Sequence, residues 1–232
     1  MPLVTLTCAV GSPFEVRRFK IHEGISDVFR VEAEVTATDP NVDLEAIIGR
    51  EAGLELQSGY AHATKGQRVW TGICNHIQQV QGVTTGLGTI AVSTYLVSIV
   101  PILWMLTQRT NHRIFQRLSI PDIVDKVFQE WKVQAEWKIN REAYPKLEFK
   151  VQYGETDFDF VNRLLEEAGI AFTTDAEQNC AVVLSDDFNI HPLREHPPLP
   201  FEDNPTESAQ IEFITKLSSH HDVRPGGYQF VD

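Results

Sequence analysis

Residues 152–172 (QYGETDFDFVNRLLEEAGIAF) constrain the fold most, because the pattern of apolar residues changes its period within this short stretch. Five apolar residues follow the i, i+3, i+4, i+7 spacing of one buried helix face: Phe158, Val161, Leu164, Leu165 and Ala168. Thr156 is placed to cap the helix N-terminus with its hydroxyl, and Gly169 is placed to end the helix in the left-handed conformation. The apolar run 170–172 then suits a buried strand, so the stretch predicts a turn, a helix and a strand.

The charges on this predicted helix indicate a packing element. Asp157 and Asp159 stand in the first turn, where the helix dipole favours negative charge, and Asp159 completes a pattern that resembles a capping box with Thr156. Arg163 follows Asp159 by four residues, which predicts a surface ion pair, with contact to a neighbouring subunit as the alternative. We expect the acidic residues to face outward or cap the helix.

The first hundred residues predict an antiparallel β domain. Residues 27–38 alternate apolar and polar side chains, as in a strand with one wet face. Strands are predicted at 3–10, 14–22, 27–38, 51–58, 68–81 and 89–99, with a helical turn at 44–48 and a hairpin loop at 82–88. About six such strands suggest a closed or nearly closed barrel.

The pattern changes after residue 100. Ser119, with Pro121 and Asp122 behind it, predicts the start of a second helix whose apolar face ends at Trp131. Around the two helices we expect a compact turn at 101–107, a short link at 112–116 and an irregular extended segment at 132–151. Later strands are predicted at 170–175, 180–185, 207–217 and 222–231, with a proline-rich surface loop at 191–205.

Composition excludes several classes of protein. The chain has 232 residues and a net charge of −12, which argues against a nucleic-acid partner because a phosphate backbone needs a basic surface. We expect neither a signal peptide nor membrane insertion, since the longest apolar run, residues 95–106, is too short to span a bilayer. Cys8, Cys74 and Cys180 are far apart and predict free thiols in a reducing compartment.

No group of residues predicts an active site. The strongest metal candidate joins His220, His221, Asp222 and Glu212, but adjacent strand residues point to opposite faces, so a solvated loop is favoured. The remaining histidines are interpreted as non-ligands, two of them flanking the proline-rich loop: His191, His196, His22, His62, His76 and His112. No nucleophile motif is present, glycine-rich segment 82–88 precedes a strand, and the Glu166–Glu167 pair lies on a helix surface. We therefore predict no catalytic, cofactor-binding or metal-binding residue, no cofactor and no enzymatic activity.

Several of these segments occur together, in the same order, in one family. The chain resembles the N-terminal hub region of the VgrG proteins of bacterial type VI secretion systems. The resemblance rests on a PILWML turn at 101–106, an RIFQ segment at 113–116 and a FVNRLLEEAGI helix at 160–170, supported by 24–29, 44–49 and 223–226. Ile102 stands where the family turn carries its first tryptophan.

The resemblance implies a mainly β fold with an α insertion (α+β), built from tandem β-barrels of the contractile phage tail hub type. It divides the chain into a first barrel at 1–100, a helical insertion at 101–169 and the start of a second barrel, incomplete here, at 170–232. It also implies a homotrimer in the full-length protein, whose paired barrels form a pseudo-sixfold ring on the tube protein hexamer and the baseplate. The family continues into a neck and a spike that carries a PAAR tip and effectors. The sequence ends before those parts, as expected either of a piece of a longer protein or of an unusually short relative.

Three functions remain open. The favoured one is the structural hub of a type VI spike complex, which joins tube and baseplate to the trimeric spike for effector delivery. The first alternative is a hub or baseplate protein of a contractile phage tail or related injection particle, and the remote one is an effector hydrolase. A hub protein would be cytoplasmic and then secreted through the contractile apparatus without a signal peptide.

Overall fold

The computed structural model divides the chain into two units, residues 1–57 with 67–192 and residues 58–66 with 193–232. The structure describes residues 4–11, 14–39, 42–57, 67–84, 91–175, 181–187, 199–203, 213–219 and 221–223. Within these residues the fold is mainly β with a few helices. No helix in the described part of the chain is both long enough and apolar enough to cross a bilayer.

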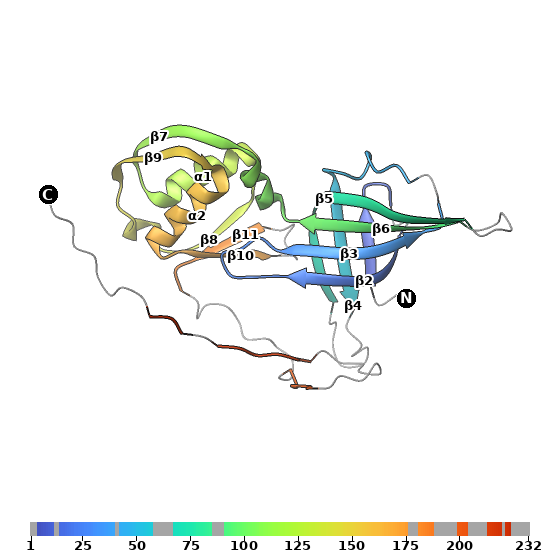
Figure 1. Ribbon diagram of the computed structural model, residues 1–232. Coiled ribbons are helices and arrows are strands. Elements are labelled where there is room, and N and C mark those ends of the chain that lie inside the picture. Colours follow the sequence, from blue (N-terminus) through green and yellow to red (C-terminus); the bar gives the residue numbers. More distant parts are fainter. Residues whose placement is uncertain are drawn as a thin grey trace. The chain divides into compact units, whose positions relative to one another are not determined.

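The first hundred residues form one antiparallel sheet of six strands that curls into a half-barrel (Figure 1). Its strands are β1 (Val4–Cys8), β2 (Glu15–His22), β3 (Arg30–Ala37), β4 (Glu51–Gln57), β5 (Gln67–Thr84) and β6 (Ala91–Val100). They are hydrogen-bonded in the order β1-β4-β5-β6-β3-β2. The six predicted strands are thus confirmed, β5 runs past its predicted end, and residues 85–88 of the predicted hairpin loop lie outside the described residues.

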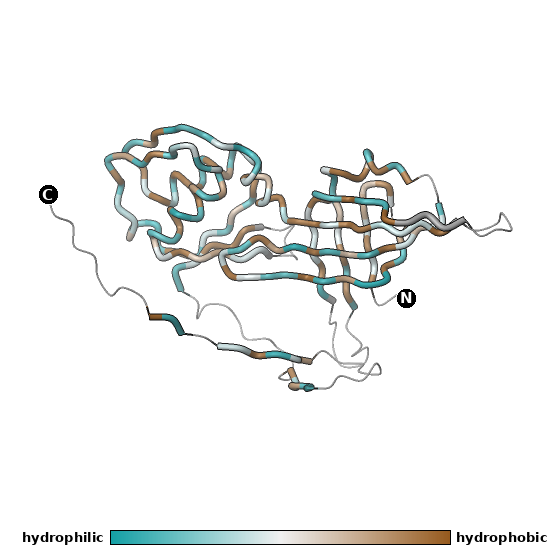
Figure 2. Tube along the Cα trace, in the orientation of Figure 1, coloured by the Kyte–Doolittle hydropathy of each residue, from teal (hydrophilic) through white to brown (hydrophobic). Residues whose placement is uncertain are grey.

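Alternation along β3 places the core of the half-barrel as predicted. Val31, Ala33, Val35 and Ala37 are buried, while the residues between them face outward, and Figure 2 shows this alternation along the strand. β5 passes close to the end of β6 at Gly72, where an added Cβ would lie 2.0 Å from the carbonyl oxygen of Val100. Only glycine allows this approach of two backbones.

The segment after the half-barrel combines helices with short strands. Its elements are a 3-10 helix (Ile102–Gln108), β7 (Thr110–Leu118), α1 (Ile120–Trp131), β8 (Ala135–Lys138), a 3-10 turn (Arg141–Ala143), β9 (Leu147–Thr156), α2 (Asp157–Ala168), β10 (Ala171–Asp175) and β11 (Ala181–Ser185). Two predictions were wrong here. The predicted link at 112–116 is the centre of strand β7, and the segment predicted as irregular, 132–151, contains β8 and the first half of β9. β7 pairs antiparallel with β9, and a pairing formed by residues about 40 positions apart leaves little local signal.

Both helices begin and end as their sequences predict. Ser119 and Asp122 form a reciprocal capping box at the start of α1. Thr156 accepts a hydrogen bond from the backbone N–H of Asp159 at the start of α2, and Gly169 ends that helix with φ 68°. A left-handed residue at this position is well suited to glycine.

The predicted buried face of α2 needs one correction. Val161, Leu164 and Leu165 are buried as predicted, but Phe160 is buried in place of the half-buried Phe158. The ring of Phe160 stacks on Phe115 of β7, with ring centroids 5.5 Å apart, so the β7–β9 ribbon rather than the helix pattern selects the buried phenylalanine. Arg163 likewise pairs with Glu155 at 2.6 Å and not with Asp159, because Glu155 on β9 lies within reach.

A second small sheet joins three separate segments. β10 pairs antiparallel with β11, and β11 pairs parallel with β8. The predicted strands 170–175 and 180–185 are therefore present as β10 and β11, and β11 pairs with β8 of the predicted helical insertion. The apolar sides of α1, α2 and this sheet form a core of their own, distinct from that of the half-barrel.

Two further strands predicted near the C-terminus fall mostly outside the described residues. Of the segment predicted at 207–217, residues 213–217 are described, and they contribute one isolated bridge, between Ile214 and Phe201, and no strand. Of the segment predicted at 222–231, only 222 and 223 are described, and neither is in a strand.

Candidate functional site

The histidines and cysteines singled out in the sequence do not gather into a site within the described residues. There, no three side chains of the metal-ligating types lie close enough to hold an ion. His22 contacts Asp27 at 3.2 Å, His112 packs edge-on against Tyr153, and His221 with Asp222 is exposed. His76 is exposed on β5, and the rest of the histidines, cysteines and acids named above lie outside the described residues: His62, His191, His196, Glu212, His220 and Cys180.

Cys74 is buried in the half-barrel core and Cys8 is half-buried, and both are free thiols. Burial raises the pKa of the Cys74 thiol to about 11 against the opposing effect of its hydrogen bond to the His76 backbone. A thiol that stays protonated at neutral pH is a poor nucleophile. Cys74 therefore serves packing rather than chemistry.

A buried carboxylate is the centre of the most highly connected polar cluster that the structure describes. Asp157, the first residue of α2, has no exposed surface. Its Oδ1 accepts hydrogen bonds from Arg113 Nη2 at 2.7 Å, Gln152 Nε2 at 2.9 Å and Asn111 Nδ2 at 3.0 Å. Strands β7 and β9 thereby bind the N-terminus of α2 from one side.

The other oxygen of the same carboxylate binds α1. Asp157 Oδ2 accepts from Arg109 Nε at 2.8 Å and from the indole Nε1 of Trp131 at 2.8 Å. Glu130, next to Trp131, pairs with Arg109, and it also pairs with Arg113, at 2.7 Å. The guanidinium of Arg109 lies over the Trp131 ring. The buried charge is thus paired and hydrogen-bonded on both oxygens, which a buried carboxylate requires.

This Asp157 cluster is built for structure and not for catalysis. Burial acts to raise the pKa of Asp157, but the hydrogen bonds donated by Gln152, Asn111, Trp131 and Arg109 outweigh it and hold the pKa below its usual value. A carboxylate with a lowered pKa and both oxygens saturated by donors cannot serve as a proton acceptor for a substrate. It can fix the relative positions of β7, β9, α1 and α2.

Sequence reasoning missed this cluster because it assigned Asp157 to the helix dipole and an outward or capping position. That assignment is corrected: the side chain points inward. Its partners at 109–113 and 131 are remote in sequence, and only the packing of β7 and α1 against α2 brings them to the carboxylate. The sequence signal that could have found it is the pair Arg109 and Arg113, two arginines four positions apart that need acidic partners when the segment is packed.

The outer face of the β7–β9 ribbon is unusually apolar for an exposed surface. Tyr153 is 81% exposed, Ile114 66% and Phe149 58%, and Val151 is also exposed. The directly opposed pairs on this face are His112 with Tyr153, Ile114 with Val151 and Gln116 with Phe149. None of the six is an acid, a lysine or an arginine, and such charge-depleted, aromatic-rich surfaces are typical of the centres of protein interfaces.

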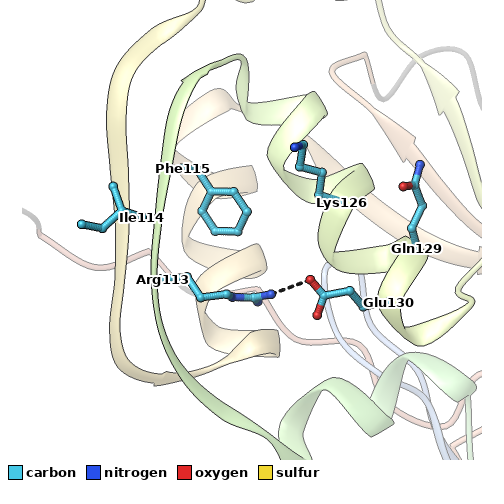
Figure 3. Close-up of a pocket in the computed structure, with 6 residues that line it drawn as sticks. All are labelled: Arg113, Ile114, Phe115, Lys126, Gln129 and Glu130. Atoms are coloured by element: carbon cyan, nitrogen blue, oxygen red, sulfur yellow. Dashed lines mark hydrogen bonds and ion pairs between the residues drawn. The ribbon is translucent and has the colours of Figure 1, made fainter.

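A groove lies between β7 and α1, beside this face. It has a volume of about 780 Å³ and is lined by Arg113, Ile114 and Phe115 of β7 and by Lys126, Gln129 and Glu130 of α1 (Figure 3). Arg113 and Glu130 pair across it at 2.7 Å. This groove and the ribbon face are therefore the candidate surfaces for interaction among the described residues.

Comparison with known proteins identifies the family. Residues 22–232 match the family described as phage tail baseplate hub (GPD). The chain belongs to the phage tail baseplate hub family. The three motifs that suggested a hub protein occupy the 3-10 helix at Ile102–Gln108, the centre of β7 and helix α2. They supply part of the second core, including Leu103, Leu106 and the buried face of α2, and one of the two arginines that bind Asp157, Arg113.

Relatives of this hub protein are spike proteins of type VI secretion systems. The type VI secretion system spike protein VgrG1b of Pseudomonas aeruginosa is 32% identical over 193 residues, which cover 82% of this chain and 24% of the relative. VgrG4b of the same organism is 37% identical over 161 residues, covering 68% of this chain and 18% of the relative. The chain thus spans about a quarter of the length of such relatives or less.

Solved structures share the hub fold at lower identity. The Escherichia coli c3393 protein, described as a type VI secretion component similar to the T4 bacteriophage tail proteins gp27 and gp5, has a TM-score of 0.58 at 22% identity and covers 81% of this chain and 51% of its own. The 43 kDa tail protein of prophage MuSo2 from Shewanella oneidensis has a TM-score of 0.57 at 15% identity, covering 78% and 52%.

Proposed function

We propose that this chain is the hub region of a type VI secretion spike complex, the part that joins the hexameric tube and the baseplate to the trimeric spike. The observation that carries the proposal is its similarity to VgrG spike proteins, at 32% identity across 82% of the chain. A phage tail hub is the second candidate, because the tail protein of prophage MuSo2 shares the fold at a comparable TM-score.

The proposed role gives the half-barrel and the helical segment separate tasks. We propose a first barrel at 1–100, a helical insertion at 101–169 and the start of a second barrel at 170–232, in the tandem arrangement that a sixfold docking surface on three chains requires. Pairing of β8 with β11 ties the last two parts together. The Asp157 cluster supports a load-transmitting role, since it joins two strands and two helices through one buried charge.

We propose that the region acts without catalysis and without a bound metal or cofactor. The relative named actin cross-linking toxin VgrG1 of Vibrio cholerae shares only 12% of its length with this chain, so its match says nothing of a catalytic region here. Its partners would be the tube protein hexamer and baseplate proteins, while the PAAR tip and effectors would be bound by downstream regions. The protein would form a homotrimer in the cytoplasm and leave through the contractile apparatus without a signal peptide.

A chimera tests this role. In the chimera, residues of this chain replace the matching region of P. aeruginosa VgrG1b. Secretion of the tube protein is then measured in a strain that lacks its own spike proteins. We expect secretion to be restored. The same chimera carrying Leu165→Asp, which disrupts the core around α2, should not restore it. A soluble, trimeric chimera that supports no secretion would reject the type VI role, and the same exchange in a MuSo2-like tail would then test the phage alternative.

A further inference from the structure

The outer edge of β7 faces the groove with its backbone. Among the described residues β7 and β9 form a two-stranded sheet, so β7 has one edge without a partner strand. Arg113, Ile114 and Phe115 are consecutive, yet all three line the groove. Successive side chains of a strand point to opposite faces, so three consecutive residues can share one groove only along the backbone edge.

Three other strand edges among the described residues, those of β2, β9 and β10, carry features that oppose the addition of a strand. β2 carries Glu15, Arg17, Arg18 and Lys20, and charged residues of this kind discourage the addition of a further strand. The carbonyl oxygen of Val151 on β9 accepts from Arg163 at 3.3 Å, and that of Phe172 on β10 accepts from the Ser26 N–H at 2.8 Å.

The centre of β7, residues 112–116, carries a single arginine. That residue, Arg113, is neutralised by Asp157 and Glu130. The second arginine of β7, Arg117, stands near the end of the strand with φ 54°. The stretch from His112 to Gln116 is therefore the part of the edge that is open to strand pairing without an unpaired charge.

The far wall of the groove presents an uncompensated positive charge. Lys126 is exposed and, within the described residues, has no ion-pair partner. Glu130, one turn further along α1, is paired across the groove with Arg113 of β7. Figure 3 shows the Lys126 side chain reaching from α1 toward Phe115. In a chain with a net charge of −12, the unpaired ammonium of Lys126 makes this wall of the groove favourable for negative groups.

We propose that the β7 edge and the groove bind an extended, acidic segment of a partner protein, which adds to the ribbon as a third strand. Main-chain hydrogen bonds to β7 would supply affinity, and alternate side chains would supply specificity. Side chains directed into the groove would place carboxylates near Lys126. Those directed outward would be apolar and extend the row formed by Ile114 and Val151. The inference does not depend on the hub role, since it concerns an edge present in the chain itself.

The test uses residues 1–232 and a fluorescein-labelled octapeptide of alternating valine and glutamate. Because strand addition relies mainly on main-chain hydrogen bonds, such a probe suffices. Fluorescence anisotropy measures binding, and amide hydrogen exchange locates it. We expect slowed exchange at 112–117, binding weakened at least tenfold by Lys126→Glu, and binding at least tenfold weaker for the same peptide with lysine in place of glutamate.

Lys146→Glu is the matched control, an exposed lysine of the same unit that does not line the groove; it should change affinity less than twofold. Unchanged urea midpoints for both variants show that the fold is retained. Equal binding of the acidic and basic peptides, protection at β2 in place of β7, or no binding at all would overturn the proposal. Protection of β7 without peptide, accompanied by a dimer in light scattering, would assign the edge to a second copy and equally reject it.

Discussion

Arg113 on β7 and Asp157 at the first residue of α2 are 2.7 Å apart, although 44 positions separate them in the chain. Arg113 also donates from Nε to Gln152 Oε1 at 2.8 Å, and Gln152 in turn donates to Asp157. The three side chains thus close a ring of hydrogen bonds between β7, β9 and α2. The relationship gives the helix N-terminus a fixed place on the ribbon, on which the groove and the exposed ribbon face depend.

Removing the charge of Asp157 should be costly. In Asp157→Asn, Arg109, Arg113 and the Trp131 indole lose their anionic acceptor, and breaking a buried ion pair on one side typically costs about 3–5 kcal/mol. Urea unfolding measures the loss. Asp159→Asn, two residues later on the exposed side of the same turn, should cost less than about 1 kcal/mol. Equal losses in the two variants would show that the cluster contributes no special stability.

The same carboxylate predicts how stability depends on pH. The pKa of Asp157 is lowered on folding, so its stabilising contribution is present above the unfolded pKa of about 4 and is lost as the pH falls toward the folded pKa. Urea midpoints measured stepwise between pH 7 and pH 3 should therefore fall below about pH 4. The fall should be shallower in Asp157→Asn, and parallel curves for the two proteins would contradict the lowered pKa.

Local patterns predicted what depends on neighbours in sequence. The caps at Ser119 and Thr156, the Gly169 stop and the alternation of β3 were all correct, because each rests on residues a few positions apart. Strand β7, the burial of Asp157 and the choice of Phe160 over Phe158 were missed. Pairing with β9 forms strand β7, contact with Trp131 of α1 helps to bury Asp157, and stacking on Phe115 of β7 buries Phe160. The local propensity of a segment does not report such contacts with residues remote in sequence.

Two glycines of the first sheet should respond differently to substitution. Gly72→Ala places a Cβ against the Val100 carbonyl, which only a shift of backbone can relieve, and we expect a loss of at least about 3 kcal/mol. Gly49→Ala meets open space but a φ of 70°, so it should cost only about 1 kcal/mol. Thermal melts of the two variants compare them. If the Gly72→Ala protein were as stable as the Gly49→Ala protein, the backbone of β5 at Gly72 would not lie against the carbonyl of Val100.

The buried face of α2 should tolerate no charge. Leu165 is 1% exposed, and Leu165→Asp would bury an unpaired carboxylate at a cost of several kcal/mol, so we expect insoluble or molten protein. The control is Glu166→Asp, a change at the next residue, which is exposed on the helix surface. This variant keeps the charge and should leave solubility and near-ultraviolet circular dichroism unchanged. A Leu165→Asp protein that melts within about 2 °C of the parent would mean that the helix packs by another face.

Assembly should depend on regions outside these 232 residues. A hub that docks on a sixfold tube needs closed cyclic symmetry and two similar barrels in each chain, whereas this chain corresponds to about 24% of VgrG1b. We expect residues 1–232 to be monomeric or weakly trimeric at micromolar concentration, and a fusion to the downstream part of VgrG1b to be a stable trimer. Light scattering coupled to size exclusion distinguishes these states. A robust trimer of residues 1–232 alone would show that the hub region carries its own subunit interface.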